Sequence, residues 1–167
     1  GSGPAGLSAA QQLNRAGHFV TVYERDNKIG GLLRYGIPDF KMEKNIIDRR
    51  LKVLIEEGIK FKCNIEVGKT ITVNELEDEF DSIVIAVGAS IKRSLPIPGS
   101  ELNGVVQAMD FLPHNNKAVD KQHLREERFN AKNKNVIVIG GGDTGSDCIG
   151  TSNRHGAKSV TNFEIMP

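Results

Sequence analysis

Two clusters of glycine in this chain of 167 residues share one spacing, and that spacing points to a particular chemistry. Residues 1–6 read Gly-Ser-Gly-Pro-Ala-Gly and residues 140–145 read Gly-Gly-Gly-Asp-Thr-Gly, so each follows the pattern G-x-G-x-x-G. Glycine at these positions lets the backbone approach a pyrophosphate at a helix N-terminus, where unpaired N–H groups attract anions. The sequence therefore predicts two dinucleotide-binding loops.

An acidic residue follows each loop at a similar distance. Glu24 lies 18 residues after the last glycine of the first loop, and Glu164 lies 19 residues after that of the second. In dinucleotide-binding domains a carboxylate about 20 residues after the loop accepts hydrogen bonds from ribose hydroxyls. Glycine clusters also make ordinary tight turns, but a doubled pattern with matching acids favours nucleotide binding.

The residues after Glu164 bear on which nicotinamide cofactor is used. A carboxylate at this place accepts a hydrogen bond from a ribose 2′-OH and repels a 2′-phosphate, whereas NADP-binding proteins carry an arginine nearby. Here Ile165 and Met166 follow Glu164. The sequence predicts a preference for NADH over NADPH.

Hydrophobic periodicity indicates the elements that must position these loops. In the first half we expect helices over residues 7–16, 43–57 and 73–80, and strands over residues 19–23, 59–67 and 82–89. In the second half we expect a strand over 135–139, a helix from the loop to residue 154, and a strand over 159–164. The apolar run 82–89 suits the centre of a parallel sheet, so Gly88 near its end would face the ligand crevice.

This order of elements predicts an α/β protein with two Rossmann-like dinucleotide-binding domains. We assign residues 1–107 to the first domain and residues 108–167 to the second, with a turn-rich linker at 96–99. Both domains are expected to be incomplete, because no strand precedes Gly1 and the second domain has delivered only one β-α-β unit. We expect the segment to be inactive on its own.

Two further stretches lie between the loops. Gly30 and Gly31, within residues 28–38, would let the main chain lie against a flat ring system where side chains would clash. The alternative is a mobile surface loop, which the apolar Leu32, Leu33 and Ile37 disfavour. A polar connector over 117–134, in which residues 121–129 could form a solvated helix, shows no pattern with an evident chemistry.

Composition narrows the function classes. The chain has 22 basic and 21 acidic residues, a net charge of +1, and no basic face that suggests nucleic acid. No apolar run approaches the roughly 20 residues of a membrane span. We therefore expect a cytoplasmic protein whose partners include neither nucleic acid nor membrane, with an organelle address left open.

The cysteine and histidine residues show no spacing that is typical of a metal site. Cys63 and Cys148 form no C-x-x-C pair, so we expect two buried apolar side chains and no metal site. His114 falls in a polar connector. His155 falls at a helix end, where a cation is favourable.

Several motifs together resemble a known family. They are Gly-Ser-Gly-Pro-Ala-Gly-Leu at 1–7, Gly-Gly-Leu-Leu-Arg-Tyr-Gly-Ile-Pro at 30–38, Ala-Met-Asp-Phe-Leu at 108–112, and residues 140–154. Over essentially its whole length the chain is similar to the small subunit, or C-terminal domain, of glutamate synthase, within the pyridine nucleotide-disulfide oxidoreductase group. Dihydropyrimidine dehydrogenase and adrenodoxin-reductase-like flavoproteins share the two-loop plan, but the stretch at 32–38 looks most like glutamate synthase.

The resemblance implies an electron relay. NAD(P)H would dock on the second domain and reduce FAD held by the first. Electrons would then pass through iron-sulfur clusters, whose cysteines lie outside this segment, to a large subunit or domain that forms glutamate from glutamine and 2-oxoglutarate. No catalytic side chain is expected here, because flavin and nicotinamide carry the hydride chemistry.

By motif match, the resemblance also implies the residues that hold each cofactor. Those for FAD are Gly1, Ser2, Gly3, Pro4, Ala5, Gly6, Glu24, Gly30, Gly31, Leu32, Gly88 and, through its backbone, Val67. Those for the nicotinamide dinucleotide are Gly140, Gly141, Gly142, Asp143, Thr144, Gly145 and Glu164. Lys41 stands where relatives often carry arginine, so it keeps the charge for an anion contact but lacks the bidentate fork.

Two alternatives stay open at this point. The chain could belong to another two-dinucleotide flavin reductase that feeds a different acceptor, as in the dihydropyrimidine dehydrogenase-like or ferredoxin-reductase-like proteins. It could also be a nucleotide-binding module without catalytic activity.

Overall fold

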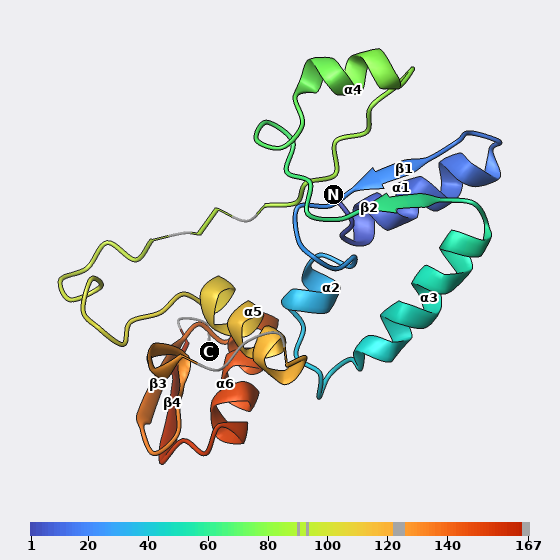
Figure 1. Ribbon diagram of the computed structural model, residues 1–167. Coiled ribbons are helices and arrows are strands. Elements are labelled where there is room, and N and C mark those ends of the chain that lie inside the picture. The colour runs from blue at the N-terminus through green and yellow to red at the C-terminus, as the bar shows by residue number, and fades with distance from the viewer. Residues whose placement is uncertain (90, 93, 122–125, 165–167) are drawn as a thin grey trace. The chain divides into compact units, whose positions relative to one another are not determined.

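The computed structural model describes residues 1–89, 91–92, 94–121 and 126–164. The chain forms two compact units, and each takes residues from two stretches of the sequence (Figure 1). Unit 1 comprises Gly1–Arg34 and Met42–Ala89, and unit 2 comprises Tyr35–Lys41 and Ser90–Pro167. The short segment Tyr35–Lys41 therefore packs with the second unit, although its neighbours on both sides in the sequence belong to the first.

Unit 1 is built on a parallel pair of short strands with helices around it. Its elements in chain order are α1 (Pro4–Arg15), β1 (Thr21–Tyr23), α2 (Leu32–Tyr35), α3 (Lys44–Glu56), β2 (Lys60–Lys62) and α4 (Val73–Glu79). β1 and β2 pair in parallel with Thr21 opposite Lys60. The apolar core consists of Leu7, Ala10, Val22, Ile29, Ile47, Leu51, Leu54 and Ile59.

The helices of unit 1 form where the sequence provides an apolar stripe or a cap. In α3, Ile47, Leu51 and Leu54 recur at helical spacing and are buried. The chain leaves this helix at Gly58, whose φ of 101° is a left-handed conformation that favours glycine. α4 begins at a capping box, because Thr72 and Glu75 each accept the other's backbone N–H.

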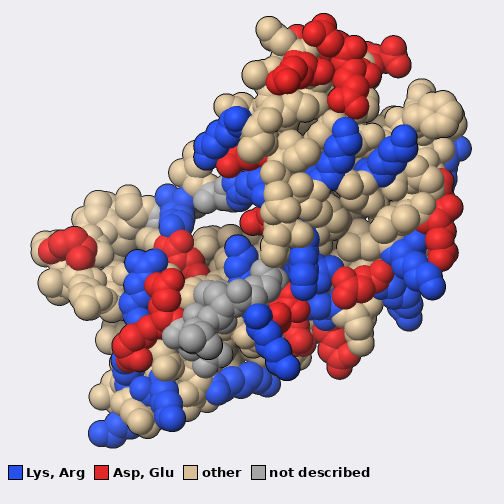
Figure 2. All heavy atoms as spheres, in the orientation of Figure 1, with Lys and Arg blue, Asp and Glu red and all other residues tan. Residues whose placement is uncertain are grey.

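Charged side chains are scattered over the face of the molecule drawn in Figure 2. Figure 2 shows the carboxylates of α4 gathered on the exposed side of that helix, and lysine, arginine, aspartate and glutamate interspersed over the rest of the face drawn. Among the described residues, no helix is both long enough and apolar enough to cross a membrane.

Unit 2 repeats the parallel-strand plan. Its elements are α5 (Ala108–Val119), the 3₁₀ helix η1 (Glu127–Phe129), β3 (Asn135–Ile139), α6 (Asp143–Arg154) and β4 (Ser159–Phe163). β3 and β4 pair in parallel from Asn135 opposite Ser159 to Ile139 opposite Phe163. The buried core of this unit is Phe111, Leu112, Phe129, Val138 and Cys148. The bounds predicted for β3 and for the end of α6 are confirmed.

The expected strand over residues 82–89 is wrong as a description of this structure. No strand is assigned there within the described part of the chain, and Ile85 and Val87 are exposed. A strand needs a neighbour that completes its ladder of hydrogen bonds, and apolar composition alone does not supply one. β2 is also shorter than the expected 59–67, because only Lys60–Lys62 pairs with β1.

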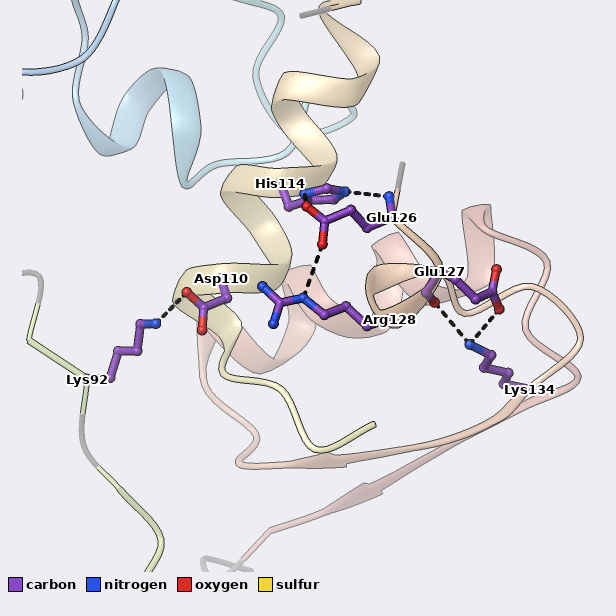
Figure 3. Close-up of polar contacts among 7 residues, drawn as sticks. All are labelled: Lys92, Asp110, His114, Glu126, Glu127, Arg128 and Lys134. Carbon is purple, nitrogen blue, oxygen red and sulfur yellow. Dashed lines mark hydrogen bonds and ion pairs between the residues drawn. The ribbon is translucent and has the colours of Figure 1, made fainter. Parts of the chain in front are cut away.

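Two parts of the expected polar connector over 117–134 are helical, the end of α5 up to Val119 and η1. α5 continues through Pro113 to Val119 and buries His114, whose Nε2 accepts the backbone N–H of Glu126 at 3.0 Å (Figure 3). Phe129, expected on a solvated helix, lies in the core. Residues 122–125 of that expected helix lie outside the described residues.

His155 lies at the end of α6, as expected, where it is the C-cap residue and is buried. Its Nδ1 accepts the backbone N–H of Ala131 at 3.3 Å, and its Nε2 lies 2.8 Å from Oδ1 of Asn115. Both ring nitrogens of this buried side chain therefore have partners elsewhere in unit 2.

The expected burial is confirmed for Cys148 but only in part for Cys63. Cys148 lies in the core of unit 2, where burial raises the pKa of its thiol to about 11. Cys63 is half-buried and packs against the core of unit 1.

Candidate dinucleotide sites

The first glycine loop turns directly into α1. Gly3 is the N-cap of this helix with an extended ψ of −178°, and the backbone N–H of Leu7 donates to the carbonyl of Gly3 at 3.0 Å. Pro4 fits the first helical position because its missing N–H would have had no partner there. The exposed Pro4 and Ala5 and the half-buried Gly3 leave the helix N-terminus open to solvent, as an anion site requires.

The glycines of this loop have different steric roles. A Cβ on Gly6 would lie 1.9 Å from the carbonyl oxygen of Gly1, so the turn closes on itself only because Gly6 has no side chain. A Cβ on Gly1 would lie 2.5 Å from the carbonyl oxygen of Ala86. A Cβ on Gly3 would meet nothing within 4 Å. Gly3 therefore borders the space that a ligand at the helix N-terminus would occupy.

The Gly30–Gly31 turn lies against the same loop. The N–H of Gly30 donates to Oγ of Ser2 at 3.0 Å. Gly31 has a φ of 51°, and a Cβ there would lie 2.8 Å from Cα of Gly3. These contacts make the turn a support for the first loop, so the mobile surface loop considered in the sequence analysis is not what this stretch forms.

Glu24 is 5% exposed and braces the first loop from the end of β1. Its Oε2 accepts the N–H of Ser2 at 2.9 Å and also the Ser2 hydroxyl, while its Oε1 accepts the N–H of Asp26 at 2.9 Å. Burial alone would raise the pKa of Glu24, but the hydrogen bonds from Asp26 and Ser2 together lower that pKa below its ordinary value. The carboxylate is therefore held ionised beside the loop.

The second loop repeats the glycine geometry of the first. Gly142 caps α6 with a ψ of −174°, and a Cβ there would meet nothing within 4 Å. A Cβ on Gly145 would lie 2.1 Å from the carbonyl oxygen of Gly140. Asp143 and Thr144 open the first turn of α6 and are exposed. The two loops thus have the same geometry. The last glycine, Gly6 or Gly145, packs against a carbonyl oxygen of its own loop, and the middle glycine, Gly3 or Gly142, borders open space.

Glu164 follows β4 as Glu24 follows β1, and it also reaches back to its loop. Its carboxylate lies over Gly141, where a Cβ would come within 1.8 Å of Oε2. Unlike Glu24, it is exposed. Ile165 and Met166, on which the cofactor prediction also rests, lie outside the described residues.

The remaining predicted residues divide between the units. Leu32 and Val67 are exposed in unit 1, and Gly88 has a φ of 70° with open space around its Cα. Lys41 does not join them, since it packs in unit 2, where its Nζ lies 2.6 Å from a carboxylate oxygen of Asp147. The structure therefore brings Ser2, Gly3, Glu24, Gly30 and Gly31 together in one cluster. The anion that Lys41 contacts is the carboxylate of Asp147.

The contacts of three residues, Ser2, Asp147 and Asn116, are not indicated by the motif spacing. The hydroxyl of Ser2 joins Glu24 to Gly30, and no spacing rule indicates such a bridge. Asp147 stands four residues after Asp143 on α6, a helical spacing that could have placed both acids on one face. Asn116 reaches carbonyls 79 and 81 residues away in sequence, which no local pattern could indicate.

Comparisons with known proteins agree with this geometry. The model of the pyridine nucleotide-disulphide oxidoreductase family matches residues 1–167. The chain is 56% identical to the small chain of glutamate synthase [NADPH] of Mycobacterium tuberculosis, over 100% of this chain and 35% of that protein. It is 54% identical to glutamate synthase [NADH] of Saccharomyces cerevisiae, over 100% of this chain and 8% of that protein. The chain thus spans about a third or less of the length of these curated relatives.

A solved structure supports the fold. FprA of Mycobacterium tuberculosis in complex with NADPH superposes with a TM-score of 0.77 at 25% identity, covering 97% of this chain and 41% of FprA. Together with the parallel strand pairs, this likeness confirms the predicted α/β class with Rossmann-like units.

Proposed function

The chain belongs to the pyridine nucleotide-disulphide oxidoreductase family, and we propose that it is the reductase module of a glutamate synthase that passes electrons from NAD(P)H to FAD. The observation that carries this proposal is the shared construction of the two glycine loops, each with open space at its middle glycine. The sequence identity to glutamate synthases over the whole chain supports glutamate synthesis as the reaction that receives the electrons.

Unit 1 provides the features that an FAD pyrophosphate and ribose need. The open space at Gly3 adjoins the N-terminus of α1, and the ionised Glu24 lies beside the same loop. Gly1, Ser2, Pro4, Ala5 and Gly6 shape that loop, and Leu32, Val67 and Gly88 would contact other parts of the cofactor. When bound, the flavin supplies the two-electron acceptor for the nicotinamide hydride, while the protein binds and orients it.

Unit 2 would hold the nicotinamide dinucleotide in the same way. Residues 140–145 would receive the pyrophosphate at α6, and Glu164 would accept hydrogen bonds from the adenosine ribose. An exposed carboxylate over Gly141 favours a ribose 2′-OH over a 2′-phosphate, so we propose NADH as the preferred cofactor. The relatives bear names of both kinds, [NADPH] in Mycobacterium tuberculosis and [NADH] in Saccharomyces cerevisiae, which makes this position worth testing.

The later steps of the proposed electron transfer involve groups outside these 167 residues. We propose that iron-sulfur clusters outside these residues carry electrons onward to a glutamate synthase large subunit or domain, and that the enzyme is cytoplasmic. A second candidate, a flavin reductase that serves another acceptor, is supported by the likeness to FprA.

Two measurements on the full-length protein test the proposal. A visible spectrum should show bound flavin that NADH bleaches without oxygen, and a protein without such flavin would contradict the proposal. With glutamine and 2-oxoglutarate added, NADH oxidation should yield glutamate. Flavin reduction without glutamate formation would favour the second candidate.

A further inference from the structure

The segment Tyr35–Lys41 is fastened to unit 2, although the chain enters it from α2 and leaves it toward α3. The side-chain amide of Asn116 on α5 donates to the carbonyl oxygens of Tyr35 and Ile37, both at 2.9 Å. The Nζ atom of Lys117 lies 4.9 Å from the centre of the Tyr35 ring. We call this stretch the docking segment.

The far end of the docking segment lies on α6. The guanidinium of Arg154 lies 3.7 Å from the centre of the Phe40 ring. A Cβ on Gly150 would come within 2.6 Å of the same ring. Glycine is unfavourable inside a helix, and here it makes the room that Phe40 occupies. The sequence of α6 is thus adapted to receive this segment.

Lys41 brings a positive charge to the same helix. Its Nζ lies 2.6 Å from Oδ1 of Asp147, whose side chain is largely buried. The hydrogen bond to Asp147 raises the pKa of Lys41 above its ordinary value, and the charge of Asp143 acts in the same direction. Lys41 is therefore attracted by both acids in the first turns of α6.

Those two acids are unfavourable neighbours for a dinucleotide. A pyrophosphate at the N-terminus of α6 would bring negative charge to the helix end that carries Asp143 and, one turn later, Asp147. The first turn of α1, by contrast, contains no acidic residue. Something must offset the acids if the second loop is to bind an anion as the first would.

We propose that Lys41 is a positioning residue of the second dinucleotide site, where it offsets the charge of Asp147 when the docking segment lies on α6. This inference rests on the proposed function, since it assumes that the second loop binds a nicotinamide dinucleotide. By linkage, dinucleotide binding and docking of the segment then favour each other to the same degree. Lys41 thereby acts on the nicotinamide site and not as an FAD ligand.

A double-mutant cycle on the full-length protein tests this role, with the Kd for NADH and NADPH measured by isothermal titration calorimetry without other substrates. Lys41→Met should weaken binding about tenfold, which corresponds to about 1.4 kcal/mol, because Asp147 would then carry an uncompensated charge near the phosphates. Lys41→Arg should restore the affinity. Asp147→Asn should bind at least as tightly as the parent, and Lys41→Met with Asp147→Asn should return to within about threefold of it.

A matched control is Lys92→Met, which removes the partner of Asp110 on α5 and should leave the Kd unchanged. If Lys41 served only to fasten the segment, Asp147→Asn would weaken binding as much as Lys41→Met and the double variant would not recover, which would overturn the inference. Flavin absorbance in every variant reports whether unit 1 is intact. A parent protein that binds neither NADH nor NADPH would contradict the proposed function itself and the inference with it.

Discussion

In the first glycine loop the carboxylate of Glu24 is 5% exposed and holds Ser2, whereas in the second the carboxylate of Glu164 is exposed and lies over Gly141. The glycines themselves behave alike, since Gly6 and Gly145 each close against a carbonyl oxygen of their own loop. The comparison separates two requirements. The turn requires glycine at the same positions in both loops, while the acid beside the loop is buried in one case and exposed in the other.

The residue beneath each acid explains part of this difference. Ser2 offers both an N–H and a hydroxyl to Glu24, and the hydroxyl also accepts the N–H of Gly30. The equivalent Gly141 has no side chain to offer. The first loop is therefore held in place by buried hydrogen bonds among Ser2, Glu24 and Gly30. Substitutions in the two loops test whether they differ in this way.

The largest effect is expected where the two loops are alike. Gly6→Val and Gly145→Val would each place a Cβ about 2 Å from a backbone carbonyl oxygen, which cannot move without opening the turn. We expect each change to lower the free energy of unfolding by about 3 kcal/mol or more, measured by urea denaturation of the full-length protein. Gly142→Ala is the control, with a loss below about 1 kcal/mol. Equal stability of all three variants would show that the loops are not closed in this way.

Gly3→Val should separate binding from folding. A side chain there enters open space, so the protein should unfold at nearly the same urea concentration as the parent. The same side chain would occupy the proposed pyrophosphate position, and we expect colourless protein after purification. Stoichiometric flavin in this variant, read from its visible spectrum, would move the FAD site away from the first loop.

Glu24→Ala should weaken FAD binding about tenfold or more, because a lost charged hydrogen bond costs roughly 1.5–3 kcal/mol. Fluorescence titration of the apoprotein with FAD measures this affinity. Ser2→Ala serves as a comparison, since it removes only the hydroxyl that joins Glu24 to Gly30. If the two variants bind FAD equally well, Glu24 acts only as a brace for the loop.

Glu164→Ala should change cofactor choice without changing stability, because this carboxylate is exposed. Loss of a ribose hydrogen bond and of repulsion toward a 2′-phosphate should shift the ratio of kcat/KM for NADH and NADPH about tenfold toward NADPH. Adding Ile165→Arg should increase the shift. A parent enzyme that already prefers NADPH would show that other residues set the specificity.

The smallest effect concerns pH. The pKa of Glu24 is lower in the folded protein than its ordinary value, so its contribution to stability is present above the unfolded-state pKa and is lost as the pH falls through the folded-state value. Glu24→Gln should therefore flatten the decline of the unfolding free energy between about pH 5 and pH 3. A decline as steep in Glu24→Gln as in the parent would show that this carboxylate contributes no pH-dependent stability.

Much of the fold follows from local sequence. The bounds of β3 and the end of α6 agree with their hydrophobic pattern, and the glycine spacing places both loops at helix N-termini. The run at 82–89 was predicted wrongly because strand formation depends on a partner that its own residues do not provide. His114 and Phe129 were misjudged because their burial depends on packing between α5 and η1.

The positions of the candidate site residues could be predicted from the sequence in part. The spacing indicated that Glu24 and Glu164 lie near their loops, but not that Ser2 would engage one of them. Lys41 and Asp147 could not be paired from the sequence, since their contact depends on the docking segment packing in unit 2. The spacing of residues within a motif predicts which of them lie close together, but it does not predict contacts between residues of distant motifs.

The place of Tyr35–Lys41 within unit 2 also decides how this protein can be recombined with its relatives. A chimera that exchanged only residues 90–167 would leave Asn116 and Asp147 facing a docking segment from the other parent. Two crossovers flanking residues 35–41, in addition to one near residue 90, would keep each contact within one parental sequence. An exchange of unit 2 that preserves these contacts therefore needs two inserted pieces, and recombinants with a single junction should be less stable than those with all three.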